Sequence, residues 1–370
     1  MGGPIVITGG GTGGHVFPMQ AIAERLVSRG IAPSEIRYVG SRRGQEATLL
    51  AGGDIALTLL PGRGIRRSLQ LRAWRDNFGA VAALLGAVAT ALLMIGRWRP
   101  RVVVSVGGYA SFAVSLAAVL WRRPLVLVEL DAAPGAALRF LQRFATKRCR
   151  AFASGEPDTV VTGAPIRDAV AAVDRSLAAR ATARLAAEPP IGPERQVVVV
   201  MTGSLGSTRV NTAVSDLAQR WADRSDRTII HVTGRRDYDQ VRAARPSTTR
   251  LDYRVLEFGD MAALWTLCDV AVCRAGSATM AELAALAIPA VLVPLPGMGD
   301  HQAHNASDVV RAGGARLIED ARCDGQTLGR VLDEIMTPET LNAMAQVTGT
   351  FGRLDAAGAI ATIVCEVGGC

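Results

Sequence analysis

The sequence predicts an α/β protein with two Rossmann-like domains, each a doubly wound parallel sheet, that face each other across a cleft. Short runs rich in Val and Ile alternate with helical stretches along nearly all of the 370 residues, which is the pattern of parallel sheets covered by helices. The alternation breaks once, at the proline-rich residues 188–193, and then restarts. Each half also begins with a strand that runs into a glycine-rich turn.

The two glycine turns are the most informative motifs in the chain. Residues 5–8 lead into Gly9-Gly10-Gly11-Thr12-Gly13-Gly14-His15, and residues 197–201 lead into Thr202-Gly203-Ser204-Leu205-Gly206-Ser207. A turn of this kind between a strand and a helix directs backbone N–H groups and the helix dipole at an anion. Two such turns suggest an enzyme that brings together two phosphate-bearing substrates.

The expected elements define the domain boundaries. The first domain covers residues 1–165, with strands at 5–8, 36–39, 55–60, 102–106, 125–128, 151–153 and 160–165 and a first helix from Pro18 to just before Gly30. The second covers residues 196–350, with strands at 197–201, 228–232, 253–256, 270–273, 290–293 and 316–318. Residues 166–195 form the linker region. In the last segment, 351–370, a helix near 356–364 is a candidate to pack back on the first domain.

Residues 77–96 allow two interpretations. They carry no charged side chain, and their length reaches the roughly 20 residues that span a membrane. However, the stretch is rich in Ala and Gly, and its larger residues recur at the spacing of one helix face: Leu84, Leu85, Val88, Leu92 and Ile95. We therefore favour a helix packed on the sheet over a membrane-spanning helix.

Charge and cysteine content narrow the class of partner. The formal net charge is +8, which favours an anionic partner such as a phosphorylated substrate or an anionic lipid. No basic stretch is interleaved with aromatic residues as base stacking requires, so nucleic acid is disfavoured. The six cysteines form no CxxC pair and have no His at zinc-ligand spacing. We expect reduced thiols in a cytosolic protein, no metal site and no secretory signal.

The first glycine turn also matches the GxGxxG pattern of dinucleotide-binding proteins. An NAD site needs an acidic residue about 20 residues later, at the end of the second strand. The chain has Ser41-Arg42-Arg43 there. Arginines suit a 2′-phosphate, but the missing acid disfavours a nicotinamide cofactor, and we expect no cofactor.

Several polar residues lie where ligands bind in such folds. His15 is a usable general base, because the unperturbed pKa of histidine is about 6.5; alternatively, it only hydrogen-bonds the turn. Ser204 offers a hydroxyl to a ligand diphosphate; alternatively, it only forms an ordinary turn. The Glu282 carboxylate is able to accept hydrogen bonds from two ribose hydroxyls. Alternatively, it only compensates the helix dipole, since acidic residues are common in a first helical turn. The loop at 293–302 ends in polar residues at the carboxyl edge of a strand, where these folds bind ligands.

Taken together, these motifs resemble those of the MurG family, bacterial GT-B glycosyltransferases of family 28 that transfer N-acetylglucosamine from its UDP derivative to the peptidoglycan lipid precursor. The resemblance covers nearly the whole chain, in order. It is carried by residues 9–18, 41–46, 106–111, 161–167, 202–206, 257–258, 273–282, 300–302 and 305–306.

The resemblance implies an inverting transferase with no essential metal. Its acceptor would be lipid I, the undecaprenyl-diphosphate muramyl pentapeptide, glycosylated at the muramyl 4-hydroxyl to give lipid II. It implies a role in cell wall biogenesis, cell shape and cell division, and a peripheral location on the cytoplasmic face of the bacterial inner membrane. The first domain would bind the acceptor and the membrane, and the second would bind the UDP-sugar.

The resemblance also implies roles for individual residues. For catalysis we expect His15 as the base, with Asp131 and Glu129 in reserve. The residues expected to bind substrate are Thr12, Gly13, Gly14, Asp131, Arg167, Ser204, Phe258, Gly259, Ser277, Ala278, Thr279, Met280, Ala281, Glu282 and Gln302. Ser204 and Arg167 would face the donor, Phe258 and Gly259 the uracil, Glu282 the ribose and Gln302 the sugar.

The chain departs from the family at several positions. The family motif His-Glu-Gln-Asn is Val128-Glu129-Leu130-Asp131 here, and Leu138, Ala164 and Leu205 replace Asn, Asn and Gln. These departures keep two alternatives open. One is a related GT-B glycosyltransferase acting on a different lipid or natural product. The other is a membrane-associated binding protein of this fold that has no catalytic activity.

Residues 63–75 are the expected membrane contact. They mix arginines with Leu69, Leu71 and Trp74, and Phe78 follows. Apolar residues rimmed by cations suit docking on anionic headgroups, at about 1 kcal/mol per cation. The alternative is an ordinary solvated helix start.

Overall fold

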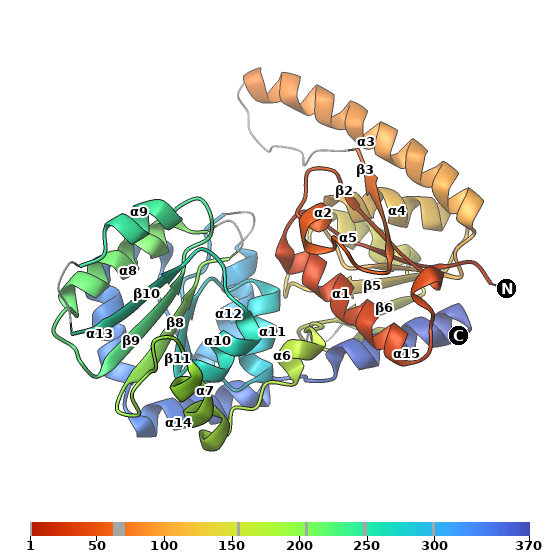
Figure 1. Ribbon diagram of the computed structural model, residues 1–370. Coiled ribbons are helices and arrows are strands. Elements are labelled where there is room, and N and C mark those ends of the chain that lie inside the picture. The colour runs from red at the N-terminus through yellow and green to blue at the C-terminus, as the bar shows by residue number, and fades with distance from the viewer. Residues whose placement is uncertain (1, 62–70, 154–155, 204–205, 247–249, 298–299) are drawn as a thin grey trace. The chain divides into compact units, whose positions relative to one another are not determined.

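The protein has two compact units, each built on one parallel sheet (Figure 1). The computed structural model describes residues 2–61, 71–153, 156–203, 206–246, 250–297 and 300–370. The first unit comprises Met1–Arg167 with Asp355–Cys370, and the second comprises Asp168–Leu354. The predicted fold class, two doubly wound Rossmann-like sheets, is confirmed.

The first unit contains a seven-stranded sheet in the order β3-β2-β1-β4-β5-β6-β7. Its strands are β1 (Ile5–Thr8), β2 (Ile36–Ser41), β3 (Ala56–Leu60), β4 (Val102–Ser105), β5 (Leu125–Glu129), β6 (Lys147–Arg150) and β7 (Thr159–Val161). All of them pair in parallel. The chain order reverses between β1 and β4, and such sheets bind ligands at the carboxyl ends of the strands on either side of this reversal.

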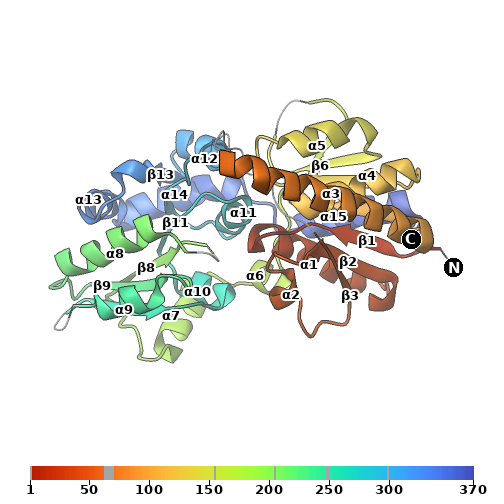
Figure 2. The same ribbon diagram turned by 90° about the horizontal axis from the view of Figure 1, so that it is seen from above.

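Helices cover both faces of this sheet (Figure 1). α3 (Leu71–Trp98) packs on α4 (Tyr109–Leu120), and α1 (Gly13–Ser28) packs on α15 (Ala356–Gly368). Seen from above in Figure 2, α3 lies in front of the strands. The shorter helices of this unit are η1 (Pro33–Glu35), α2 (Glu46–Leu49), α5 (Ala136–Leu141) and η2 (Gln142–Phe144). The C-terminal helix therefore belongs to the first unit, where Arg29, directly after α1, donates to the Gly358 carbonyl.

α3 contains the apolar stretch at 77–96. Ala87, Ala91 and Ile95 are buried, whereas Leu85 and Leu93 are 65% and 78% exposed. The expected place of Leu85 on the buried face was wrong, because α3 packs on α4 through small alanines that allow a close approach. No helix in the described part of the chain is long and apolar enough to cross a membrane.

The second unit contains a six-stranded parallel sheet in the order β10-β9-β8-β11-β12-β13. Its strands are β8 (Gln196–Met201), β9 (Arg227–Val232), β10 (Asp252–Leu256), β11 (Val270–Cys273), β12 (Ala290–Leu292) and β13 (Ala315–Leu317). Its helices are α6 (Asp168–Ala171), α7 (Leu177–Ala186), α8 (Thr208–Arg220), α9 (Tyr238–Ala243), α10 (Met261–Leu267), α11 (Ser277–Ala285), α12 (His301–Arg311), η3 (Asp320–Arg322), α13 (Gly325–Ile335) and α14 (Pro338–Thr350). The segment expected as a linker, 166–195, holds α6 and α7, and both contact α10.

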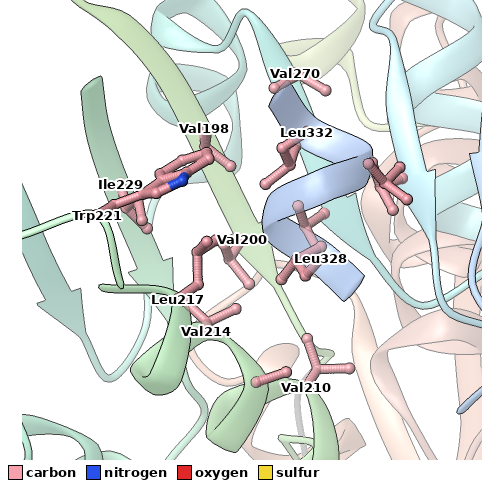
Figure 3. Close-up of a cluster of buried hydrophobic side chains, with 14 of the residues drawn as sticks. Val198, Val200, Val210, Val214, Leu217, Trp221, Ile229, Val270, Leu328 and Leu332 are labelled. Carbon is pink, nitrogen blue, oxygen red and sulfur yellow. The ribbon is translucent and has the colours of Figure 1, made fainter. Parts of the chain in front are cut away.

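A core cluster of the second unit lies between its sheet and the helices α8 and α13 (Figure 3). Val198 and Val200 of β8 meet Leu217 of α8 and Leu328 and Leu332 of α13, all of them buried. The strand is apolar at every position from 197 to 200 because helices cover both faces of a parallel sheet. This rigid layer positions the loops at the carboxyl ends of β8 and β11.

Two predicted elements were misplaced. The strand expected at 151–153 is β6, slightly earlier in the chain. Its basic residues concealed it, yet Arg150 is only 2% exposed because it lies against the buried Glu129. The first helix begins at Gly13, not at Pro18, so Pro18 lies inside α1. There its ring removes one backbone hydrogen bond.

Candidate functional site

A buried carboxylate, that of Glu46, accepts hydrogen bonds from the backbone at the first glycine turn. Glu46, the first residue of α2, is fully buried and accepts from the backbone N–H groups of Gly11 at 3.0 Å and Ser41 at 2.9 Å. Gln45 Oε1 accepts from the Gly13 N–H at 3.0 Å. The N–H groups of Gly11 and Gly13 are therefore already used. A phosphate at the first turn would therefore have to be bound by other donors than these two.

Glycine is required where the loops after β1 and β4 meet. A Cβ atom at Gly10, whose φ is +147°, would lie 1.8 Å from Glu46 Oε1. A Cβ atom at Gly108, whose φ is +83°, would lie 2.2 Å from the Gly10 carbonyl oxygen. Because only glycine allows this approach, the two loops pack directly on each other at the point where the strand order reverses.

His15 lies in the first turn of α1, beside the loop after β4. A Cβ atom at Gly107 would be 3.5 Å from His15 Nε2, so the imidazole lies close to this glycine. Its Nδ1 is buried and has no hydrogen-bond partner among the described residues. Burial lowers the pKa of His15 below its usual 6.5, against the opposing effects of Asp131 and Glu46. The imidazole is therefore neutral near pH 7, the form that a general base needs.

Glu129, at the end of β5, is fully buried among cationic and amide groups. Its Oε1 accepts from Gln142 Nε2 at 2.9 Å and Arg148 Nε at 3.2 Å, and its Oε2 lies 3.3 Å from Arg150 Nε. Arg150 also donates to the Ala132 carbonyl at 3.1 Å. This arrangement pairs the Glu129 carboxylate with two arginines and holds the loop that follows β5. Glu129 therefore suits a positioning role better than the reserve role of a base.

The other expected residues of the first unit lie near α1. Thr12 precedes the helix and is exposed, and its hydroxyl makes no capping hydrogen bond. Gly13 and Gly14 are the first two residues of the helix. The Arg167 guanidinium lies 4.3 Å from the centroid of the Phe17 ring. Asp131 is half-buried just beyond the strand end and acts electrostatically on His15.

In the second unit, the carboxylate of Glu282 is held by an indole. Glu282 is 7% exposed on α11, and Trp265 of α10, which is fully buried, donates its Nε1–H to Glu282 Oε2 at 2.8 Å. The helix that carries Glu282, α11, begins at Ser277, after Gly276. Helix N-termini attract anions, and the expected phosphate-binding residues lie along its first two turns: Ser277, Ala278, Thr279, Met280 and Ala281.

Phe258 and Gly259 follow β10 and precede α10. The Phe258 ring is 52% exposed, and the Arg235 guanidinium lies 5.6 Å from its centroid. A Cβ atom at Gly259 would lie 2.5 Å from Leu264 Cδ1. Gly259 therefore packs tightly on α10, and the groups that it offers to a ligand are those of its backbone.

Gln302 joins two loops at the carboxyl edge of this sheet. Its Oε1 accepts from the backbone N–H of Ala275, after β11, at 3.2 Å and of Leu295, after β12, at 2.9 Å. Asn305 Nδ2 donates to the Ala275 carbonyl at 3.2 Å. The carboxamide oxygen of Gln302 is therefore engaged, so any contact with a sugar would use its amide nitrogen.

The expected contacts at Ser204 and Leu205 lie outside the described residues, as does the basic segment at 63–75 except for the backbone at the start of α3. The rest of the second glycine turn is described. The N–H of Gly206 donates to the Gly203 carbonyl at 3.0 Å. A Cβ atom at Gly206, where φ is +73°, would lie 2.6 Å from the Thr233 carbonyl oxygen. Here too, glycine allows the turn to approach a neighbouring strand end.

Models of both glycosyltransferase family 28 domains match the chain, the N-terminal domain over residues 5–149 and the C-terminal domain over residues 197–359. The chain belongs to glycosyltransferase family 28. A UDP-N-acetylglucosamine--N-acetylmuramyl-(pentapeptide) pyrophosphoryl-undecaprenol N-acetylglucosamine transferase of Alkalilimnicola ehrlichii is 37% identical, over 98% of each chain. The protein of the same name from Pseudomonas paraeruginosa is 34% identical over 99% of each chain.

Solved structures share the fold. The crystal structure of Acinetobacter baumannii MurG matches with a TM-score of 0.75 at 24% identity, over 98% of this chain and 99% of that one. The UDP-GlcNAc 2-epimerase of Neisseria meningitidis, bound to UDP-GlcNAc, matches with a TM-score of 0.65 at 14% identity, over 98% of this chain and all of that one. At these identities the likeness shows the GT-B type of architecture alone.

Several departures of this family 28 chain place apolar residues in the first unit. Val128 and Leu130 are buried, with 0% and 3% exposure. Leu138 lies close to Gly107, since a Cβ atom there would be 3.7 Å from Leu138 Cδ1.

Sequence reasoning missed the roles of Glu46, Trp265 and Arg274. Arg274, which follows β11, donates to Ser207 Oγ at 2.6 Å, to Asp320 Oδ1 at 2.6 Å and to the Val293 carbonyl at 3.0 Å. It therefore connects its own loop to the segments that follow β8, β13 and β12. Each of the three residues acts on a partner that is distant in sequence or shares no motif with it. For Glu46, the available signals were its place directly after the turn that follows the second strand and its membership of the family motif at 41–46.

Replacing Glu46 by alanine is expected to lower the free energy of unfolding by about 2–4 kcal/mol, because two buried backbone N–H groups lose their acceptor. Urea unfolding followed by circular dichroism measures this effect. Glu35→Ala is the matched control, since Glu35 forms an exposed ion pair with Arg101, worth less than about 1 kcal/mol. Equal losses in the two variants would contradict the role of Glu46.

A buried polar network lies beneath the second glycine turn. Asn211 Nδ2 donates to the Thr233 carbonyl at 3.1 Å and to Asp237 Oδ2 at 2.8 Å, so its Oδ1 must accept. The donor is Nε2–H of His231, at 3.0 Å. His231 Nδ1 is then the acceptor for the Tyr253 hydroxyl, at 2.9 Å. The network therefore requires a neutral His231 with its proton on Nε2.

Stability should depend on pH through His231. Burial lowers its pKa to about 3, so below pH 6.5 the unfolded chain binds a proton that the folded chain does not. The free energy of unfolding is expected to fall by about 1.4 kcal/mol for each pH unit below about 6.5. His231→Gln keeps one donor and one acceptor but cannot be protonated, and denaturant titrations should show a shallower pH dependence. His304→Gln is the control, because His304 is exposed on α12, and this variant should show the same pH dependence of stability as the wild-type protein. If His231→Gln also showed the wild-type pH dependence, this prediction would be contradicted.

Proposed function

We propose that this chain transfers N-acetylglucosamine from UDP-N-acetylglucosamine to lipid I, with inversion, and so forms lipid II for peptidoglycan synthesis. The observation that carries the proposal is the match of 98% of the chain, at 37% identity, to a relative named for this transfer. The neutral His15 in the first unit and the indole-held Glu282 in the second give the two halves the chemistry that such a transfer needs.

The proposed reaction is a direct displacement. The muramyl 4-hydroxyl oxygen attacks C1 of the sugar, the bond from C1 to the diphosphate oxygen breaks, and UDP leaves with the electron pair. The neutral imidazole of His15 takes the hydroxyl proton, with Asp131 as the alternative base. Negative charge grows on the diphosphate in the transition state. Donors placed to meet that charge account for much of the catalysis in reactions of this kind.

The diphosphate is assigned to the second glycine turn and to the N-terminus of α11. Ser204 and the Arg167 guanidinium add a hydroxyl and a positive charge. The backbone of Gly259 and the ring of Phe258 would meet the uracil, and Glu282 the ribose. Gln302 would donate its amide N–H to a sugar hydroxyl, because its oxygen already accepts two backbone hydrogen bonds.

Transfer is tested with radiolabelled UDP-N-acetylglucosamine and a short-chain lipid I analogue. Labelled lipid II is the expected product, and its formation should survive a chelator. The second candidate, transfer to a different lipid or natural product, is favoured by the apolar Leu138, which lies near Gly107 in the first unit where the family motif has Asn. It would be supported if lipid I stays unlabelled while another acceptor is glycosylated. UDP binding without transfer to any acceptor would support a binding protein instead.

We also propose a peripheral location on the cytoplasmic face of the inner membrane. Phe140 and Phe144 are 44% and 48% exposed, and their ring centroids are 5.6 Å apart. Arg139 and Arg143 precede them in the sequence and are also exposed. Aromatic rings rimmed by cations suit an anionic lipid surface.

Co-sedimentation with vesicles tests this location. The protein is expected to bind vesicles rich in phosphatidylglycerol and not those of phosphatidylcholine alone. Phe140→Ser/Phe144→Ser should weaken the binding several-fold. Leu177→Ser is the control, because Leu177 is an exposed apolar residue of the second unit. Equal binding to both kinds of vesicle, or no effect of the double variant, would argue against this surface.

A further inference from the structure

One short helix, α10, carries the contacts that surround the proposed nucleoside site. Asp260 caps its N-terminus, accepting from the Ala262 N–H at 3.0 Å. Leu264, in the middle of the helix, packs against Gly259, the residue assigned to the uracil. Trp265, the next residue, donates to Glu282, the residue assigned to the ribose. The proposed base and ribose contacts are thus built on adjacent positions of one helix.

The indole of Trp265 is fully fixed in place. Its side chain has no exposed surface. Its backbone carbonyl accepts a hydrogen bond from the Arg175 guanidinium, which comes from the segment between α6 and α7. A buried indole N–H has no water to bond, so it needs an acceptor inside the protein. Glu282 Oε2, at 2.8 Å, is that acceptor.

This hydrogen bond has consequences for the carboxylate. An indole N–H can donate but never accept, so it fixes which carboxylate oxygen of Glu282 faces the protein. A carboxylate held in one orientation loses less conformational freedom when a ligand binds, and that preorganisation increases affinity. The two hydroxyls of a ribose are donors that need an ionised acceptor in a defined position.

We infer that Trp265 is a positioning residue for nucleotide recognition: its indole N–H orients Glu282 to accept the vicinal hydroxyls of the donor ribose. The inference rests on the proposed function, since it takes the ribose contact of Glu282 as given. It adds a residue that never touches the nucleotide and that sets the preference of the site for ribose over a sugar without these hydroxyls.

The test compares two ligands, UDP and 2′,3′-dideoxy-UDP, by calorimetry on wild-type protein and on Trp265→Phe. Phenylalanine keeps most of the apolar bulk and removes the donor. The variant is expected to bind UDP about tenfold more weakly, a difference of about 1.4 kcal/mol. Its affinity for the dideoxy analogue is expected to stay within about twofold of wild type. An equal loss for both ligands would mean a general packing defect and would overturn the inference.

Trp221→Phe is the matched control. Trp221 is 5% exposed in the core of the same unit and packs there against aliphatic side chains such as Leu217 and Ile229 (Figure 3). This variant should keep the wild-type ratio of affinities for the two ligands. A changed ratio in Trp221→Phe would show that any loss of core volume alters ribose recognition, and would overturn the specific role of Trp265.

Glu282→Gln separates the inference from the function on which it rests. If Glu282 contacts the ribose, Glu282→Gln weakens UDP and leaves the dideoxy analogue nearly unaffected. If that holds while Trp265→Phe weakens both ligands equally, only the positioning role fails. If Glu282→Gln does not distinguish the two ligands, the ribose contact itself fails.

A spectroscopic measurement keeps the inference testable if Trp265→Phe does not fold. In protein labelled with 15N-tryptophan, the indole resonance of Trp265 is the one that shifts most in Glu282→Gln. That resonance is expected to shift when UDP is added to the wild-type protein and to shift much less with the dideoxy analogue. An indole spectrum that does not change in Glu282→Gln, or equal shifts with both ligands, would overturn the inference.

Discussion

Replacing His15 by alanine is expected to lower kcat by about 10²–10⁴-fold, the usual contribution of a general base. The affinity for UDP should change by less than about twofold, because the uridine and ribose contacts are assigned to the second unit. Steady-state kinetics with the lipid I analogue measures the first quantity, and calorimetry with UDP measures the second. His304→Ala is the control, since His304 is exposed on α12 and bonds the Asp300 carbonyl of its own turn.

The pH profile adds a second readout for His15. Burial lowers the pKa of the imidazole, so the ring stays neutral, and able to accept a proton, at pH values somewhat below 6.5. Activity should therefore persist as the pH falls through 6.5 and be lost at lower pH, when the ring becomes protonated. Retained turnover in His15→Ala would remove His15 as the base, and Asp131→Asn would then be the next variant to measure.

Replacing Glu129 by leucine is expected to lower the free energy of unfolding by about 3–5 kcal/mol, the cost of breaking a buried ion pair by removing one partner. Arg150 is 2% exposed and would keep its charge with fewer acceptors, chiefly the Ala132 carbonyl and Glu156. Urea unfolding followed by circular dichroism measures the loss. It is expected to exceed that of every other single variant proposed for stability.

The double variant Glu129→Leu/Arg150→Met tests the physical cause. Removing both charges leaves no buried ion without a partner, so part of the stability should return. A double variant no more stable than Glu129→Leu would contradict the pairing argument. Glu129→Gln tests the alternative role: loss of turnover at unchanged stability would identify Glu129 as the base and not as a positioning residue.

Most of the sheet could be predicted from sequence because its signal is local. A parallel strand covered on both faces needs apolar residues throughout, and β8 shows this as an unbroken run of valines. β6 was misplaced because its sequence is basic and lacks this apolar signal. It contains three basic residues, and Arg150 is tolerated in the interior only because Glu129 of the neighbouring strand lies beside it. No local pattern contains that information.

The two glycine turns show the same limit at the candidate site. In sequence they look equivalent, each a glycine-rich turn between a strand and a helix. In the structure, the Gly11 N–H of the first turn already donates to Glu46. A turn presents a backbone N–H group to a ligand only if no side chain of another element already accepts a hydrogen bond from it.

The sequence by itself determined the α/β class, the repeated strand–turn–helix units, the membership of family 28 and the motif positions of the candidate site. These depend on spacing along the chain, which the residues carry directly. Only the tertiary structure decided that Glu46 fills the first turn, that Glu129 is buried among arginines and that Trp265 holds Glu282. These contacts depend on hydrogen bonds and charges that meet only when separate helices and strands pack together, and their energies come from the burial that folding creates.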